Sequence, residues 1–272
     1  MRIRRILFIL PLVGASLAIA AASAKAGAFL APAGHGEIIT ATSFSDTTRA
    51  FDDNGRLLPV PAYQKFALGT YVEYGLTDAI TLVAEPGVDL AHQATPQMPP
   101  PVAAGTDFGA RVGLVNFGDT ILSLQGLVHL PFAAASHQAA LFDQDRASAV
   151  DLRLLLGHGF AIGTMPGFLD VETSHTWQGD GLPDEWHADF TVGLRPQPQL
   201  LIMLASFMTV AGHPTAACAP WSCSYWSWLK LQPSLVYDLT QQWSVELGFF
   251  ATIVGQDAGR ELGPMTAFWY RF

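Results

Sequence analysis

The sequence predicts an all-β protein, a transmembrane antiparallel up-and-down β-barrel of about 12 strands. Three observations predict it. Apolar and polar residues alternate with period two almost everywhere after residue 35, the connections between these segments are alternately short and long, and the chain ends on the aromatic stretch "AFWYRF" (267–272). Strands with one apolar and one polar side alternate in this way, and short turns at one end with long loops at the other are typical of membrane barrels.

The composition agrees with a membrane protein that has no membrane-spanning helix. Half of the 272 residues are apolar and only 14% are charged, against about 25% in an ordinary soluble domain. The most apolar run after the N-terminus, "LLIMLASFMTVAG" (200–212), is shorter than the ~20 residues that a helix needs to cross a bilayer. The apolar residues are therefore distributed over strands.

Residues 1–26 are expected to be a cleaved signal peptide. Three arginines (Arg2, Arg4, Arg5) precede the apolar run 6–21, and "ASA" or "AKA" supplies the small residues of a cleavage site. An uncleaved anchor is the alternative, which the small residues disfavour. Residues 27–272 then form a single barrel domain in the outer membrane of a Gram-negative cell. Loss of the three arginines changes the formal net charge from −9 to −12, which argues against nucleic acid as a partner.

About twelve segments alternate, and each is expected to be one strand. In the eleventh, Trp243 and Leu247 lie on one face and Ser244 and Glu246 on the other. The expected strands are 36–45, 63–74, 79–90, 105–116, 120–131, 147–162, 167–177, 185–195, 199–211, 226–237, 242–253 and 263–272.

The connections fall into two classes that alternate along the chain. Short turns rich in Gly, Pro, Asp and Asn are expected at 75–78, 116–119, 163–167, 195–199 and 238–242. Longer loops are expected at 46–62, 91–104, 132–146, 178–184, 212–225 and 254–262. An even number of strands returns the C-terminus to the end of the barrel at which the chain entered.

The last strand carries Phe268, Tyr270 and Phe272 on one face, where their rings would lie in the aromatic girdle at a membrane interface. This ending resembles the C-terminal strand of bacterial outer-membrane proteins, whose final Phe is part of an assembly signal. The resemblance implies outer-membrane lipid and the barrel assembly machinery as partners.

A hairpin in the first half carries a second resemblance. "VEYGLTDAITLVAEPG" (72–87), with a weaker echo in "VYDLTQQWSVELG" (236–248), resembles hairpins in the outer-membrane channels linked to meta-cleavage phenol degradation. That resemblance implies transport of aromatic or hydrophobic compounds. The alternative is that Leu-Thr-Asp makes a good turn on any barrel.

If the apolar faces contact lipid, most charged residues of the strands point into the lumen, because Arg or Lys at the lipid midplane costs about 2–4 kcal/mol. Ten acids then outnumber six bases and predict a net-acidic passage, which favours neutral or cationic solutes. A lattice of salt bridges that braces the lumen is the structural alternative. The expected lumen-lining residues are Lys65, Glu73, Glu85, Asp107, Arg111, Asp151, Arg153, Asp170, Glu172, Asp189, Arg195, Lys230 and Glu246, joined by Glu37, Asp89 and Arg271.

Cys218 and Cys223 are the only cysteines, and in an exported protein their short spacing predicts a disulfide. A metal site is disfavoured because the nearby His213 completes only a weak ligand set. No cofactor is expected. A lipid-face enzyme would need a Ser–His pair on adjacent strands; the nearest candidates, His175 and Ser206, have a strand between them, so we expect no enzyme.

Three further stretches have alternative interpretations. The glycines of "GHG" (157–159) predict a bulge that turns His158 away from lipid. "PWSCSYWSW" (220–228) predicts an interfacial aromatic belt in preference to a sugar-binding platform. "GAFLAPAGHG" (27–36) could plug the periplasmic mouth of the barrel.

The expected function is a passive outer-membrane channel for small solutes, including aromatic or hydrophobic ones. A closed structural or interaction barrel is the main alternative, and a lipid-face enzyme is the weaker one. No feature of the sequence predicts an oligomeric state.

Overall fold

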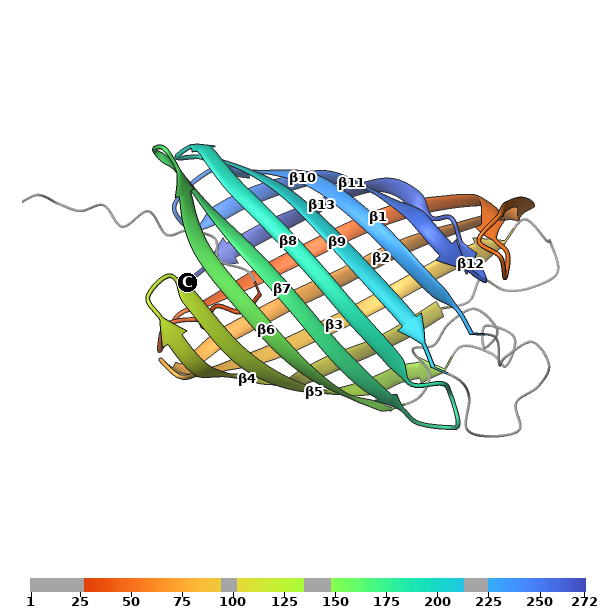
Figure 1. The fold of residues 1–272 in the computed structure, drawn as a ribbon, viewed down its shortest axis with the longest axis horizontal. Coiled ribbons are helices and arrows are strands. Elements are labelled where there is room, and N and C mark those ends of the chain that lie inside the picture. Colours follow the sequence, from red (N-terminus) through yellow and green to blue (C-terminus); the bar gives the residue numbers. More distant parts are fainter. Residues whose placement is uncertain (1–26, 94–101, 135–147, 213–224) are drawn as a thin grey trace, which may run out of the picture.

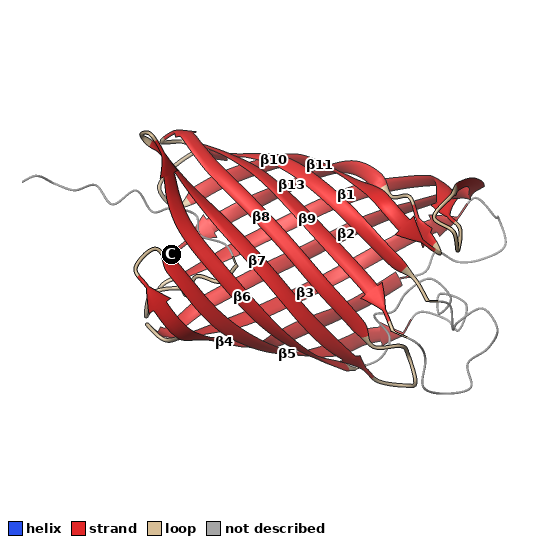
Figure 2. Ribbon diagram, in the orientation of Figure 1, coloured by secondary structure: helices blue, strands red, loops and turns tan. Residues whose placement is uncertain are grey.

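The computed structural model describes residues 27–93, 102–134, 148–212 and 225–272. Within these residues the chain is a closed antiparallel β-barrel with strongly tilted strands (Figures 1 and 2). The barrel closes because β1 pairs on one side with β2 and on the other with β13. No helix in the described part of the chain is long and apolar enough to cross a membrane.

Each strand pairs with its neighbours in the sequence. The strands are β1 (Gly36–Phe51), β2 (Leu57–Thr77), β3 (Ile80–Gln93), β4 (Val102–Phe117), β5 (Thr120–Ala134), β6 (Ala149–Ile162), β7 (Met165–Gln178), β8 (Glu185–Gln197), β9 (Leu200–Ala211), β10 (Ser227–Asp238), β11 (Trp243–Gln256), β12 (Ala258–Gly259) and β13 (Leu262–Arg271). Because β12 has two residues and pairs only with the end of β1, the described residues form a barrel of twelve long strands. The predicted fold class is confirmed.

The expected loop at 46–62 is wrong. β1 and β2 remain paired as far as Phe51 and Leu57, so that only residues 52–56 connect them. The backbone N–H and C=O groups of residues 46–62 need hydrogen-bond partners, and the pairing of β1 with β2 supplies many of them. The register shifts once, at a bulge between Thr47 and Arg49.

The two ends of the barrel differ. At one end the strands are joined by tight turns, two of which contain Gly118 and Gly163 with positive φ of 71° and 63°. The C-terminus lies at this end (Figure 1), which we call the short-turn end. We call the opposite end, where the longer connections lie, the long-loop end.

Large apolar side chains cover the outer surface of the barrel. Phe66, Phe108, Leu152, Phe190 and Leu247 are among those with about two fifths or more of their surface exposed. Their neighbours in the strands are buried or half-buried. The period-two alternation therefore assigns the apolar side to lipid, as the sequence predicted.

A small apolar core lies inside the barrel near the short-turn end. Inward side chains such as Leu155, Phe168, Leu201 and Trp269 form it together with Phe29, which precedes the first strand. These inward residues interrupt the polar lumen that the sequence predicted. The sequence contains a signal for these inward apolar residues, because runs such as 154–156 and 200–204 carry apolar residues on both faces of the strand.

Candidate functional site: the lumen of the barrel

The structure places all of the expected lumen-lining charges on the inner face. Each is buried or half-buried and alternates with outward residues. The set comprises Lys65, Glu73, Glu85, Asp107, Arg111, Asp151, Arg153, Asp170, Glu172, Asp189, Arg195, Lys230 and Glu246, together with Glu37, Asp89 and Arg271.

Many of these charges are paired with one another across neighbouring strands. Arg153 on β6 lies 2.8 Å from Glu172 on β7 and 3.7 Å from Asp189 on β8, and its Nε lies 3.5 Å from Asp151. Such pairs hold the strands of the wall together and leave fewer free charges facing the lumen. The predicted salt-bridge lattice is therefore present.

Two carboxylates of the lattice were missed in the sequence. Asp238 lies 2.7 Å from Arg195 and 3.5 Å from Arg271. Glu261 lies 3.1 Å from Lys65 and 2.9 Å from Lys230. Both residues fall in stretches that were interpreted as connections. For Asp238 a signal was available, because it continues the inward alternation of Ser234 and Val236, which are buried.

We call residues 27–35 the N-terminal segment: residues 27–31 lie inside the short-turn half of the lumen, and residues 32–35 are exposed at its mouth. Its backbone is bound mainly by side chains of the wall. Asp170 accepts a hydrogen bond from the amide of Ala28 (2.6 Å), whose carbonyl accepts one from Ser123 (2.7 Å). Thr81 accepts one from the amide of Ala31 (2.9 Å). The segment therefore contacts the wall on β3, β5 and β7.

Arg111 on β4 is the centre of this arrangement and has only 2% of its surface exposed. Its Nη1 donates to the carbonyl of Phe29 (2.9 Å), its Nε to Gln125 (3.0 Å) and its Nη2 to Tyr71 (2.8 Å). Tyr71 in turn donates to Glu73 (2.8 Å), which lies 3.4 Å from Nη1. A buried guanidinium whose donors are satisfied in this way fixes both the wall and the segment.

Two inward glycines make room for the N-terminal segment. A Cβ at Gly113 would lie 2.7 Å from Cδ1 of Leu30, and one at Gly157 would lie 2.8 Å from Cε2 of Phe29. A side chain at either position would therefore force Leu30 or Phe29 of the segment to shift. The wall is therefore shaped to receive this segment.

The structure keeps the candidate catalytic pair apart. His175 packs against Trp177 and Trp186, with ring centroids 4.5 and 4.4 Å apart. Ser206 pairs with Phe190 on the intervening strand β8, whereas His175 pairs with Trp186 on that strand. His175 thus lies in an aromatic belt near the long-loop end.

Two local predictions are wrong. β6 runs from Ala149 to Ile162 without a register shift, so no bulge forms at "GHG" and His158 stays exposed on the outer face. Its position at the short-turn end makes this tolerable, because it can bond the hydroxyl of Thr120 (2.8 Å). The predicted belt at 220–228 fails at Trp228, because Nζ of Lys230 lies 4.9 Å from its ring centre on the lumen side; residues 220–224 of that stretch lie outside the described residues.

The expected disulfide between Cys218 and Cys223 and the expected signal peptide lie outside the described residues, and both stay predictions. The terminal aromatics are described: Phe268 and Phe272 are exposed on the outer face, while Trp269 is buried inside. Among the described residues, no group of His, Cys, Asp and Glu side chains is arranged to hold a metal ion.

Comparison with known proteins identifies the fold. No protein-family model matches the chain, and no curated protein matches it in sequence. The chain is similar in structure to a crystallised outer-membrane channel from Pseudomonas putida F1, with a TM-score of 0.71 and 11% identity over 90% of this chain and 98% of that one. The KdgM porin gives a TM-score of 0.49 and 7% identity over 86% and 99% of the two chains. The protein thus has the fold of a bacterial outer-membrane β-barrel.

Proposed function

We propose that the protein is an outer-membrane channel for small solutes and that its N-terminal segment narrows the periplasmic end. One observation carries the proposal. The segment occupies the lumen but is not a strand of the wall, and it is held mainly by hydrogen bonds between wall side chains and its backbone. A plug bound in this way can be displaced while the barrel stays closed.

The size of the barrel agrees with a narrow channel. Eight-stranded barrels are filled by their own side chains and sixteen-stranded porins leave an aqueous pore, so twelve strands suggest a partly filled interior. The short-turn half is filled by the apolar core and the N-terminal segment. The long-loop half is lined by charged residues such as Lys65, Asp89 and Lys230.

The charges of the lumen favour neutral or cationic solutes over anions. Inward carboxylates outnumber inward bases, and Asp238 and Glu261 add to the excess. In a narrow passage such an excess raises the local concentration of cations and repels anions. The resemblance to channels for aromatic compounds then applies best to aromatic solutes without negative charge.

The location follows from the same features. An exposed apolar belt on the outer face needs lipid, and we propose the outer membrane as its source. The outward Phe268, Tyr270 and Phe272 suggest that the barrel assembly machinery inserts the chain.

Planar-bilayer recording of refolded protein tests the proposal. We expect small, cation-preferring conductance from the full mature chain and larger conductance from a chain that begins at His35. Asp170→Asn, which weakens the contact with Ala28, should raise the open fraction. Asp189→Asn, which changes the lumen charge equally but does not touch the segment, is the matched control.

A closed structural barrel is the second candidate, and the apolar core around Phe29 favours it. Absence of conductance both in the full mature chain and in the shortened chain would support that candidate and contradict the channel.

A further inference from the structure

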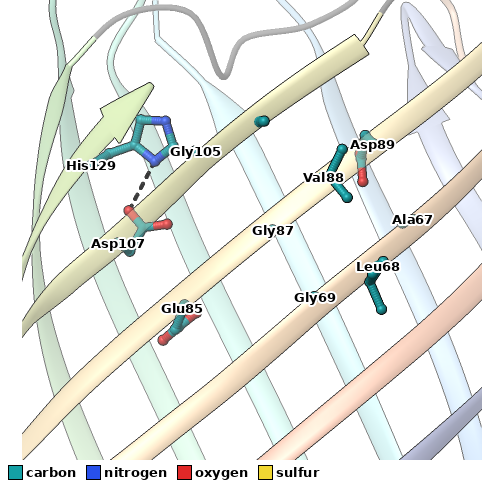
Figure 3. Close-up of a pocket in the computed structure, with 11 residues that line it drawn as sticks. Ala67, Leu68, Gly69, Glu85, Gly87, Val88, Asp89, Gly105, Asp107 and His129 are labelled. Carbon is teal, nitrogen blue, oxygen red and sulfur yellow. Dashed lines mark hydrogen bonds and ion pairs between the residues drawn. The ribbon is translucent and has the colours of Figure 1, made fainter. Parts of the chain in front are cut away.

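The long-loop half of the lumen contains a recess in its wall, formed by β2, β3, β4 and β5 (Figure 3). Its volume is about 170 Å³. A cavity of about 150 Å³ can hold a benzene molecule, so this recess has the size of a single six-membered ring. It lies on the other side of Arg111 from the short-turn end, and the N-terminal segment does not occupy it.

Three glycines form the floor of the recess. In the strand register Gly69 faces Gly87, and Gly87 faces Gly105, so the three lie in one row across three strands. A Cβ at Gly69 would meet no atom within 4 Å, and one at Gly87 would meet only the carbonyl oxygen of Leu68, at 3.7 Å. The row is therefore open above Gly69 and Gly87, whereas the imidazole of His129 covers Gly105, where a Cβ would lie 2.7 Å from Cε1. Since neighbouring strands are ~4.8 Å apart, the open floor spans about the width of one aromatic ring, with the His129 imidazole at its β4 end.

Two carboxylates stand beside this floor on adjacent strands. Glu85 and Asp107 are directly opposite each other in the register. Like charges in this arrangement are destabilising unless a positive group lies between them. Asp107 contacts His129 (3.1 Å), whereas Glu85 makes no hydrogen bond or ion pair with any described residue.

The nearby bases are engaged elsewhere. Lys65 lies between Asp89 (3.7 Å) and Glu261 (3.1 Å), and Arg153 is held by the three carboxylates described above. The recess therefore has an excess of negative charge and one carboxylate without a partner.

We infer that this recess binds an organic cation built on a single ring, with its ammonium or amidinium group between Glu85 and Asp107 and its ring over Gly69 and Gly87. The charge between the two carboxylates offsets their repulsion, and the planar ring covers backbone that carries no side chains. The inference names a solute class for the proposed channel and rests on that function for its biological meaning. The binding itself requires no conductance.

Isothermal titration of refolded full-length protein in detergent tests the inference, with benzamidinium as the cation, benzamide as its neutral analogue and benzoate as the anion. We expect benzamidinium to bind and to be weakened roughly tenfold or more by Glu85→Gln, the effect of losing a charge-assisted hydrogen bond. Glu246→Gln, which removes a lumen carboxylate on β11 that does not line the recess, should change the affinity less than twofold.

Filling the floor gives an independent variant. Gly87→Val should abolish binding, because its side chain projects into the recess and its Cβ makes only an ordinary contact, 3.7 Å, with the carbonyl oxygen of Leu68. Gly126→Val is the matched control, since a Cβ at Gly126 meets nothing within 4 Å but points to lipid. Heat-modifiable migration in SDS verifies that each variant is folded.

Equal binding of benzoate or benzamide, or affinity that is unchanged in both Glu85→Gln and Gly87→Val, would overturn the inference. Recording in bilayers separates it from the proposed function. If benzamidinium binds but no conductance is found, the cation site is supported and the channel function is contradicted. If conductance is found but benzamidinium does not bind, the channel function is supported and the cation site is contradicted.

Discussion

At the scale of single residues, Arg111 connects more parts of the lumen through its side chain than the other residues discussed above. It joins the wall to the N-terminal segment through Phe29 and also binds Tyr71, Glu73 and Gln125. Removing one member of a buried charged pair leaves the other without compensation, which typically costs about 3–5 kcal/mol.

We therefore expect Arg111→Ala to lower the free energy of unfolding by about 3 kcal/mol in urea titrations of protein in lipid vesicles. It should also make the N-terminal segment accessible to protease. Arg111→Lys should recover only part of the loss, because an ammonium cannot reproduce the planar set of donors. Arg56→Ala, at an exposed turn, is the control. Unchanged protease resistance in Arg111→Ala would contradict the assigned role.

At the scale of elements, residues on the two faces of the last strand, β13, are expected to affect different properties: the outer face membrane assembly and the inner face stability. Phe272 is on the outer face, with its ring 6.4 Å from that of Tyr74 and 5.9 Å from that of Tyr270. Arg271 is on the inner face, 2.7 Å from Glu37. The two neighbours therefore serve different sides of one strand.

We expect Phe272→Asp to reduce assembly in cells, because it places a charge in the aromatic girdle. Arg271→Gln should assemble but unfold at lower urea concentration, because it loses its ion pairs with Glu37 and Asp238. The fraction of heat-modifiable protein in membranes measures the first effect and urea titration the second. Equal assembly of the two variants would argue against an assembly role for Phe272.

Glu261, in the connection between β12 and β13, is expected to make the stability of the barrel depend on pH. Burial alone would raise the pKa of Glu261, but attraction by Lys65 and Lys230 holds it below its ordinary value of 4.5. The stabilisation that Glu261 provides is thus complete above about pH 4.5 and is lost as the pH falls through the lower pKa of the folded state.

We expect wild type to be more stable than Glu261→Gln at about pH 6 and the difference to shrink towards about pH 3. Urea titrations at both pH values measure it. A difference that does not change with pH would show that the Glu261 ion pairs do not contribute to stability.

At the scale of the whole molecule, the closed barrel predicts how the protein behaves in the cell. The mature chain should begin near Lys25 or Gly27 and should migrate differently in SDS before and after boiling, because closed barrels resist cold detergent. N-terminal sequencing and gel migration of membrane fractions test both points. A protein recovered from the soluble periplasm without a heat-modifiable band would contradict the membrane location.

The sequence by itself determined the number of long strands, their order and, at most positions, the face that each strand presents to lipid. Period-two alternation is a local property, because consecutive side chains of a strand point to opposite sides whatever the strand pairs with. Trp243 and Ser244, or Phe272 and Arg271, could therefore be assigned to opposite faces before the barrel was known. The turn residues likewise separated the short-turn end from the long-loop end.

The contents of the lumen depended on the tertiary structure. The contact of Asp170 with Ala28 joins residues 142 positions apart, and closure of the barrel, which no local pattern encodes, brings them together. The position of His158 also depended on strand pairing. β6 pairs with both neighbours without a register shift, so His158 stays on the outer face although its flanking glycines suggested a bulge. The row of Gly69, Gly87 and Gly105 exists because two strand registers align, and a register is set by the pairing of strands and not by either strand alone.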